Sequence, residues 1–489
     1  MKNYNLKNIS PFKKELQADT MKVPVIFHAS EDLLPKEEVF KQLEELAQNE
    51  QLFNHVAALS DAHSKKGLRT PAGVVAASEN YLFPQLVDAA PNCGMRLILT
   101  DLSEQEMKPE KVDQLFRALV SAIPTKKYIG KAIPSEVSMD VFRKGSKAVT
   151  DYFSVRTRNE LENTFKNGNA FTCNTEEDCP TKREIRDVIP SLFIKMGRYR
   201  LGILGATESH FLSLMKVKEI FNDETSKKLN IRADQYAFLM HTGSGIIGRY
   251  IASLYTPVSE NRFLGKTILR TGQTFFDSQM RPVFNNLRKK IKLAEQKKEL
   301  FSYEDQSIEG RMFIAAFQAA SNYGFANRAV ITHQLDLALE QIFQRPVDLQ
   351  LLYDTPHVYI NQENHFGKNV WVHRNGATRA LFGEPILIAP LVNTLAYVGV
   401  GTDKNESTFF SANHEIGKAD AINLETIRSD ELSPQNNDYT FDIYRGRKKT
   451  IGNQNTLYQQ YAEKIVEDLA SNNIMNTVAA LEPVVMLTY

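Results

Sequence analysis

Short β-type runs, each bounded by turn residues, alternate along this chain with amphipathic helices of moderate length. One helix is predicted to open at Pro109, because a proline suits the first helical position and apolar residues follow at helical spacing. A second is predicted after Ser307, a candidate N-cap. Their apolar stripes, which we expect to be core contacts, are Val112, Leu115, Phe116, Leu119 and Ile123, and Phe313, Phe317, Ala320 and Gly324. This alternation predicts an α+β (mixed α/β) fold.

The chain has 489 residues, which would allow two or three domains, yet no linker forces a split. Residues 370–374, Asn375-Gly376 and residues 377–380 predict a β-hairpin, because Asn-Gly tolerates the positive φ angles of a type I′ turn. Residues 287–300 are rich in lysine and helical in composition. We expect a solvated surface helix there rather than an RNA-binding arm.

Charge and cysteine content limit the function and the compartment. The formal net charge is +1, which excludes a strongly basic nucleic-acid binder, so any such contact must come from a local patch. The chain has three cysteines, Cys93, Cys173 and Cys179. An odd number without CxxC spacing fits a reducing compartment. We expect Cys173 and Cys179 to be surface or loop thiols. Because no signal-peptide core or bilayer-spanning run is present, we expect a cytoplasmic protein with no membrane partner.

One cysteine and four histidines lie in short runs rich in Gly, Asn, Ser or Thr, and several of these runs follow an apolar stretch typical of a strand. Loops at strand ends present polar groups on a rigid scaffold, and a thiolate with neutral imidazoles binds a divalent metal. The five residues are Cys93, His210, His241, His357 and His414. A lone histidine is more often structural, and this is our interpretation of His28, His55, His333, His365 and His373.

Two motifs near these residues leave their roles open. Residues 242–245, Thr-Gly-Ser-Gly, fit a phosphate cradle made of backbone amides and equally a tight turn. Asp61 and His63 belong to one motif, in which Asp61 would orient or contact a ligand or cap a turn. His63 would either join the site or shape the loop beside it.

Read in order, the motifs resemble one family, the RtcB-type RNA-splicing ligases. Residues 59–67 (LSDAHSKKG) resemble the family's MPDVHxGxG, and residues 92–96 (NCGMR) its NCGxR or GCGM. Further matches run to the C-terminus in the family's order, and six together make chance a poor explanation. These matches are residues 201–205 leading to His210-Phe211, residues 241–244, residues 319–328, and residues 366–367 through 374–380.

The resemblance implies an architecture and a reaction. It implies one large domain of the family's own topology, residues 51–489, with a deep cleft for one or two metal ions and residues 1–50 packing on the core. Members join an RNA 3′-phosphate or 2′,3′-cyclic phosphate to a 5′-hydroxyl, using GTP and manganese, in RNA repair, RNA splicing and tRNA processing. By position, His414 would carry the nucleotide, and the metal ligands would be Cys93, His210, His241 and His357.

Some positions depart from the family. Its metal-ligating aspartate is replaced by Ala90, and Asp88 is a candidate substitute. The softer remaining set shifts the expected metal from Mn²⁺ towards Zn²⁺. The positions matching the nucleotide pocket, several with altered residue types, are Ser209, Ser213, Val358, Ala389, Glu415, Gly417, Lys418 and Thr488.

Three functions therefore remain open, and we prefer the first. It is an RNA ligase acting on broken RNA ends through a nucleotidyl-histidine, with GTP or another nucleotide. The second is a metal-dependent phosphoesterase. The third is an RNA-end-binding protein that has lost the GTP step. We expect a monomer or a homodimer.

Overall fold

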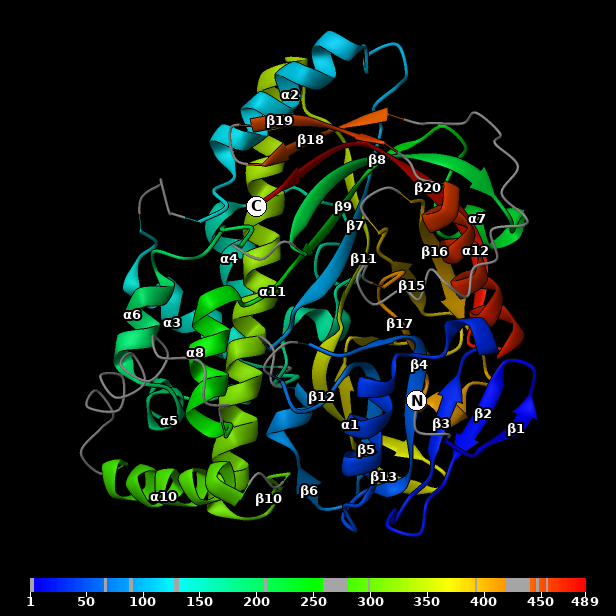
Figure 1. The fold of residues 1–489 in the computed structure, drawn as a ribbon. Helices are drawn as coiled ribbons and strands as arrows, with labels where there is room; N and C mark the ends of the chain where they lie inside the picture. The colour runs from blue at the N-terminus through cyan, green and yellow to red at the C-terminus, as the bar shows by residue number, and fades with distance from the viewer. Residues whose placement is uncertain are drawn as a thin grey trace.

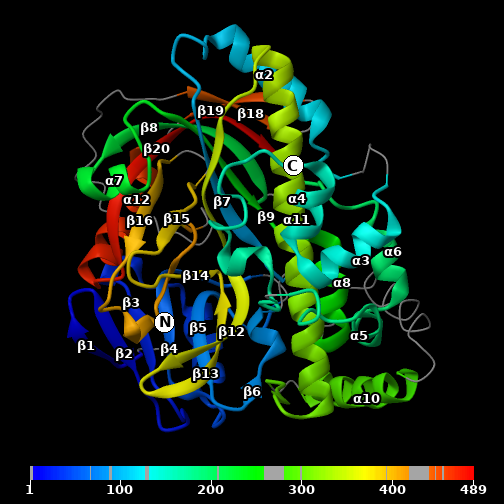
Figure 2. The same ribbon diagram turned by 180° about the vertical axis from the view of Figure 1, so that it is seen from behind.

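The computed structural model describes residues 4–65, 68–87, 91–126, 132–173, 175–205, 209–257, 280–297, 300–391, 394–417, 440–445, 448–453 and 456–489. Within these residues the chain forms two large β-sheets and a group of helices built around one long helix (Figure 1). In both views, which are 180° apart, the helical group lies on one side of this long helix and the sheets on the other (Figure 2).

The first sheet has seven strands and contains the N-terminal part of the chain. Strand β3 pairs in parallel with β4, and the hairpin β12–β13 joins the far side through β5. Residues before 50 thus contribute three strands to a sheet shared with residues after 350, and the division at residue 50 stays a prediction. In order the strands are β1 (Leu6–Ser10), β2 (Lys13–Leu16), β3 (Val25–His28), β4 (Phe53–His63), β5 (Ala72–Ser78), β13 (Lys368–Asn375) and β12 (Val358–His365).

The second sheet has nine strands and arches over the first in Figure 1. All its neighbouring strands pair antiparallel except β18 with β20. Its main path is β11 (Leu349–Pro356), β7 (Gly94–Thr100), β9 (Tyr236–Thr242), β8 (Phe211–Ile220), β20 (Met475–Thr488), β16 (Ala396–Gly401) and β15 (Pro385–Ile388). Strands β18 (Thr440–Arg445) and β19 (Lys448–Asn453) extend it beside β20, and two short ladders pair β6 (Tyr81–Leu82) with β10 (Tyr303–Glu304) and β14 (Ala377–Arg379) with β17 (Ser411–Asn413).

Helix α11 (Ile308–Phe343) is the central long helix and contacts α2, α3, α4, α5 and α8. Ser307 caps it by accepting a hydrogen bond from the Gly310 amide at 3.0 Å, as the sequence predicts. Helix α2 begins at Pro109 and buries its predicted stripe, which confirms the helix predicted there. The other helices are α1 (Glu37–Ala47), α2 (Pro109–Ala122), α3 (Ser135–Lys144), α4 (Ser146–Phe153), α5 (Lys182–Val188), α6 (Ser191–Gly197), α7 (Asp223–Lys228), α8 (Gly245–Tyr255), α10 (Arg281–Lys297) and α12 (Thr456–Ser471), with short 3-10 turns at Glu31–Leu33, Pro84–Val87, Phe165–Gly168 and Glu406–Thr408.

The hairpin predicted around Asn375-Gly376 is wrong. Strand β13 pairs with β12 and β5, whereas β14 leaves that sheet and pairs with β17. The hairpin that does form, β12–β13, turns at Phe366-Gly367, where φ is 50° and 74°. At Gly376 the chain changes sheet, because the amides of Gly376 and Ala377 both donate to the carbonyl of His357.

The prediction that Cys173 and Cys179 are loop thiols is also wrong, because the structure joins them in a disulfide. Cys179 is buried, and their Cα atoms lie 5.2 Å apart across six residues. Cys93 is a free, buried cysteine.

Among the described helices, none combines the length and the apolar character that crossing a bilayer requires.

Candidate metal centre

Antiparallel pairing in the second sheet gathers four of the predicted site residues at one edge. Chain direction alternates across β11, β7, β9 and β8, so the ends of β11 and β9 lie beside the starts of β7 and β8. His357 follows β11, His241 lies near the end of β9, and Cys93 and His210 immediately precede β7 and β8. Residues far apart in sequence thus meet because of strand register.

Three of the four converge tightly. The Sγ atom of Cys93 lies 3.4 Å from Nε2 of His210 and 3.4 Å from Nε2 of His241, and the ligand atoms of all three lie within 4.8 Å of one another. His357 joins on one side, with its Nε2 2.9 Å from Nε2 of His241. The four predicted ligands therefore form a compact trio with a fourth member beside it.

These ligand atoms fit a divalent cation. A tetrahedral zinc ion with sulfur and nitrogen ligands holds its ligand atoms roughly 3.3 to 3.6 Å apart, close to the 3.4 Å measured between Cys93 and its two histidines. Every histidine of the set presents Nε2. Two imidazole nitrogens facing each other at 2.9 Å repel unless a proton or a cation lies between them.

Burial prepares the imidazoles for metal binding but leaves the thiol protonated. Burial lowers the pKa of His210 to about 4 and the pKa values of His241 and His357 well below their usual range. A neutral imidazole offers the lone pair that a metal needs. Burial also raises the pKa of the Cys93 thiol to about 11, so a metal bound there would displace its proton.

His414 lies directly beside this cluster. It follows β17, and its ring stacks on that of His357 with centroids 4.0 Å apart. A carboxylate approaches each ring nitrogen: Oδ2 of Asp61 lies 3.3 Å from Nδ1, and Oε2 of Glu415 lies 3.5 Å from Nε2. The predicted nucleotide carrier is therefore held between two acidic groups and against a predicted metal ligand.

The two carboxylates differ in their electrostatics. Burial raises the pKa of Asp61, and its contacts with His414 only partly offset the effect. Burial would raise the pKa of Glu415 as well, but His414, His63 and Lys65 outweigh it and lower that pKa to about 2. Glu415 is thus a carboxylate at neutral pH, with Nε2 of His63 3.9 Å away.

A buried charged network beneath the centre fixes the loops that carry it. Arg328 on α11 donates to the carbonyls of Asn92 and Thr242, each at 3.0 Å, which lie next to Cys93 and His241. It also pairs with Asp354 at 2.6 Å, and Asp354 pairs with Arg96. Sequence reasoning gave these residues no role, although an arginine within a largely apolar helix was a usable signal.

A glycine in helix α11 lets the helix pack closely against the loop that carries Cys93. A Cβ added at Gly324 of α11 would lie 2.8 Å from the carbonyl oxygen of Asn92, so only a glycine lets the helix approach the cysteine loop this closely. The Asn92 amide group in turn donates to the carbonyl of Ser321 at 2.7 Å. The long helix and the loop that carries Cys93 are therefore locked together.

The predicted nucleotide positions are only partly gathered. Glu415 and Ala389 lie beside His414, because the Ala389 amide donates to the His414 carbonyl at 2.8 Å. Thr488 donates to the His210 carbonyl at 3.0 Å, Gly417 has a φ of 109°, and Ser209 is exposed. Two positions have side chains that face elsewhere: Val358 packs in the hydrophobic core, and Ser213 donates to the Val485 carbonyl. Lys418, Ala90 and Asp88 lie outside the described residues.

Together, a mixed α/β fold and a buried Cys-His cluster next to a carboxylate-flanked histidine define a candidate metal centre. Comparison with known proteins then gives the family. Residues 42–488 match the family described as "tRNA-splicing ligase RtcB", so this chain belongs to the RtcB family, and the resemblance and the mixed fold predicted from the sequence are confirmed.

The chain is similar along most of its length to members from distant organisms. It is 26% identical over 496 residues to a "tRNA-splicing ligase RtcB" of Thermococcus kodakarensis, covering 95% of this chain and 94% of that protein. It is 28% identical to one of Methanococcus maripaludis, over 82% of this chain and 81% of that one. An "RNA-splicing ligase RtcB homolog 1" of Entamoeba histolytica is 26% identical over 88% of this chain and 80% of its own length.

Proposed function

We propose that this protein is an RNA ligase that joins an RNA 3′-phosphate or 2′,3′-cyclic phosphate end to a 5′-hydroxyl end. The observation that carries the proposal is the convergence of Cys93, His210 and His241 beside the stacked pair His357 and His414, in a chain that belongs to the RtcB family. A cation site within one side-chain contact of a candidate nucleophile suits the transfer of phosphoryl groups, which are highly charged.

His414 is the proposed nucleotide carrier. If Asp61 accepts a hydrogen bond from the Nδ1 hydrogen, the proton stays on that nitrogen and Nε2 keeps its lone pair. Nε2 would attack the α-phosphorus of GTP, forming a P–N bond as the bond to the β-phosphate breaks and pyrophosphate leaves. A 2′,3′-cyclic phosphate end is first opened by water to a 3′-phosphate. An oxygen of the RNA 3′-phosphate then takes the GMP group as the P–N bond to His414 breaks, and the 5′-hydroxyl displaces GMP as the new phosphodiester forms.

The proposed metal ligands are Cys93, His210, His241 and His357, with Mn²⁺ or Zn²⁺ as the ion. A bound cation would neutralise phosphate charge and align the attacking and leaving oxygens. In the protein itself, the Arg328 network holds the Cys93 and His241 loops, and the histidines stay neutral because they are buried. The hydrogen bonds of Arg328 to both loops thus fix Cys93 and His241 relative to each other.

GTP is the proposed nucleotide. Several of the positions that match the family's nucleotide pocket carry altered residue types here. The amide and carbonyl of Ala389 are both bonded to the segment that carries His414, and Glu415 brings a negative charge to the atom proposed to react. The proposal therefore includes weak GTP binding for a member of this family.

The test is an RNA joining assay with purified protein, one RNA ending in a 3′-phosphate, one beginning with a 5′-hydroxyl, GTP and Mn²⁺. We expect a joined product that disappears on chelation and in the variants Cys93→Ser and His414→Ala. Joining that survives His414→Ala would refute the nucleotidyl-histidine. Release of a cyclic phosphate without joining would contradict the ligase function.

A further inference from the structure

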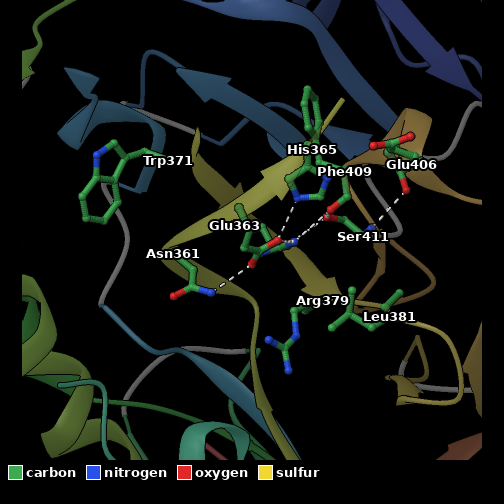
Figure 3. A network of polar contacts seen from close by, with 12 residues as sticks. Asn361, Glu363, His365, Trp371, Arg379, Leu381, Glu406, Phe409 and Ser411 are labelled. Atoms are coloured by element: carbon green, nitrogen blue, oxygen red, sulfur yellow. Dashed lines mark hydrogen bonds and ion pairs between the residues drawn. The ribbon is translucent and has the colours of Figure 1, made fainter. Parts of the chain in front are cut away.

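The hairpin β12–β13 carries a second polar cluster, separate from the metal centre (Figure 3). Glu363 lies at its middle and is fully engaged. Its Oε1 accepts from Arg374 Nη1 at 2.7 Å and from Asn361 at 3.1 Å, and its Oε2 accepts from Arg374 Nη2 at 2.8 Å and from His365 at 3.0 Å. Each oxygen of this carboxylate thus accepts two hydrogen bonds.

The neighbouring carboxylate, Glu384, is engaged in the same way. It accepts from Arg379 Nη2 at 2.8 Å and from Arg379 Nε at 3.0 Å, and it also accepts from the Leu381 amide and the Tyr353 hydroxyl. Arg379 thus binds this carboxylate through Nε and Nη2, and its guanidinium also interacts with the Tyr353 hydroxyl. The side chain of Arg379 extends away from the Glu363 cluster in Figure 3.

Lys166 and the Tyr359 hydroxyl are two further donors near Arg379, beside the ring pair Phe165 and Tyr359. The rings of Phe165 and Tyr359 meet edge to face at 5.2 Å, the Arg379 guanidinium lies 4.5 Å from the Phe165 ring, and Lys166 Nζ lies 5.9 Å from the Tyr359 ring. Tyr359 is 2% exposed, yet its hydroxyl is buried without a hydrogen-bond partner. Among the described residues, Lys166 has no hydrogen bond or ion pair from its ammonium group.

Lys166 is also held in an unusual backbone conformation. It and Asn167 both have φ of 53°, in the left-handed region that residues other than glycine rarely adopt. Burial, and secondarily the charge of Arg379, lowers the pKa of Lys166 to about 8. The chain therefore places a half-buried ammonium close enough to a guanidinium for the two charges to repel.

We infer that Lys166, Arg379 and Tyr359 form an anion site that binds a phosphodiester of the RNA strand close to the join. The inference rests on the proposed function for the identity of the ligand. Its physical basis is an excess of donors: both nearby carboxylates already accept several hydrogen bonds, whereas the Lys166 ammonium and the buried Tyr359 hydroxyl have no acceptor among the described residues, and the Arg379 guanidinium lies beside them.

The location suits a strand that leads away from the metal centre. Tyr359 lies two residues after His357, and Arg379 pairs with Ser411, three residues before His414. At about 3.3 Å per residue, the site lies roughly 7 to 10 Å from these histidines along the strands. One or two nucleotides of a single strand cover that span.

An apolar surface beside Arg379 favours RNA over a free anion. Leu381 and Phe382 follow it directly in the chain and are 39% and 76% exposed. An exposed aromatic ring next to a phosphate site can stack a base, which is how proteins hold single strands without reading sequence.

The first experiment measures binding of a labelled oligoribonucleotide with a 3′-phosphate to the full-length protein, without GTP, across a salt series. We expect Lys166→Gln to weaken binding roughly 3- to 10-fold at low salt and to reduce the slope of log K against log salt by about 0.7, the value for one phosphate contact on a single strand. Tyr359→Phe should weaken binding with an unchanged slope. Lys147→Gln, which removes an exposed lysine already paired with Asp151, is the matched control.

An unchanged affinity and slope in Lys166→Gln would overturn the site. Joining activity, measured in the same samples, separates this failure from that of the proposed function. If wild type joins RNA and Lys166→Gln binds RNA normally, only the anion site is wrong. If wild type neither binds nor joins RNA, both are wrong.

A second experiment distinguishes RNA from free phosphate. Acetylation of Lys166 by an activated ester at pH 8 is followed by mass spectrometry of its peptide, with oligoribonucleotide or inorganic phosphate as protectant at equal phosphate concentration. We expect protection by RNA alone. Equal protection by inorganic phosphate would make this a free-anion site and overturn the RNA assignment.

Discussion

At the scale of single residues, Glu415 is the departure from the family with the clearest chemical consequence. Its carboxylate lies 3.5 Å from Nε2 of His414, the atom proposed to attack GTP, and neighbouring cationic groups keep it ionised. Like charges about 4 Å apart repel by roughly 1 to 4 kcal/mol, depending on the local dielectric. A triphosphate brought to this atom therefore meets a repulsion that an uncharged residue at position 415 would not cause.

Replacing Glu415 should strengthen GTP binding. We expect Glu415→Gly to lower the Kd for GTP at least 5-fold, because about 1 kcal/mol of repulsion is removed. Glu415→Gln keeps the size and removes the charge, so it should give most of the same gain. Calorimetric titration with GTP and Mn²⁺ measures both. A weaker affinity in both variants would mean that Glu415 helps to hold the metal or the nucleotide.

The buried Arg328–Asp354 pair should be costly to break. Both side chains are fully buried, so Arg328→Met leaves the Asp354 carboxylate with only Arg96 as a charged partner and should destabilise the fold by about 3 to 5 kcal/mol. The same substitution at Arg158, whose pair with Asp348 is exposed, should cost less than about 1 kcal/mol. Urea unfolding compares the two, and equal losses would contradict the role given to the network.

At the scale of elements, local signals predicted helices well and strand partners poorly. Pro109 and Ser307 mark helix starts through interactions within one turn, which a single sequence reveals. Asn375-Gly376 carries an equally strong local signal, yet β14 pairs with β17 some thirty residues later in the chain. Pairing depends on which distant strand offers a buried partner, and no local pattern encodes that.

The hairpin β12–β13 should show an acid-dependent stability. Burial favours a neutral Glu363, but its pairing with buried Arg374 outweighs this and holds the pKa of Glu363 well below its usual value. A depressed pKa stabilises the fold above the unfolded value near 4.5 and loses that contribution as the pH falls. We expect Glu363→Gln to lose about 3 to 5 kcal/mol at pH 7. That loss should shrink steadily as the pH is lowered below 4.5.

Chemical unfolding of wild type and Glu363→Gln over pH 3 to 7 measures this convergence. Glu224→Gln, at an exposed pair with Lys228, is the control and should change little at any pH. A Glu363→Gln defect that stays constant with pH would show that its cause is packing rather than charge.

At the scale of the whole molecule, the site depends on strand register. Motif order alone predicted Cys93, His210, His241 and His357 as one set, and the structure brings the first three together with the fourth beside His241. The sequence could not reveal that Glu415 approaches Nε2 of His414 or that Arg328 supports Cys93, because both contacts arise from folding distant segments together. The Cys173–Cys179 disulfide was missed for a different reason, since cysteine spacing does not fix pairing.

Metal binding by the intact protein should release a proton. Cys93 is a thiol at neutral pH because burial raises its pKa to about 11, whereas the buried histidines are already neutral. Below that pKa, the apparent affinity should rise about tenfold per pH unit between pH 6 and 8. Calorimetric titration with Zn²⁺ and Mn²⁺ in buffers of different ionisation enthalpy counts the proton. Cys93→Ser should abolish the pH dependence, and an unchanged dependence would exclude Cys93 as a ligand.

Whether His414 carries the nucleotide is tested by incubation with Mn²⁺ and α-labelled GTP, with ATP in parallel, followed by a denaturing gel and an acid-lability assay. We expect a covalent, acid-labile GMP adduct that is absent in His414→Ala and stronger in Glu415→Gly. An adduct that persists in His414→Ala, or none with either nucleotide in wild type and Glu415→Gly, would contradict a nucleotidyl-histidine at this centre.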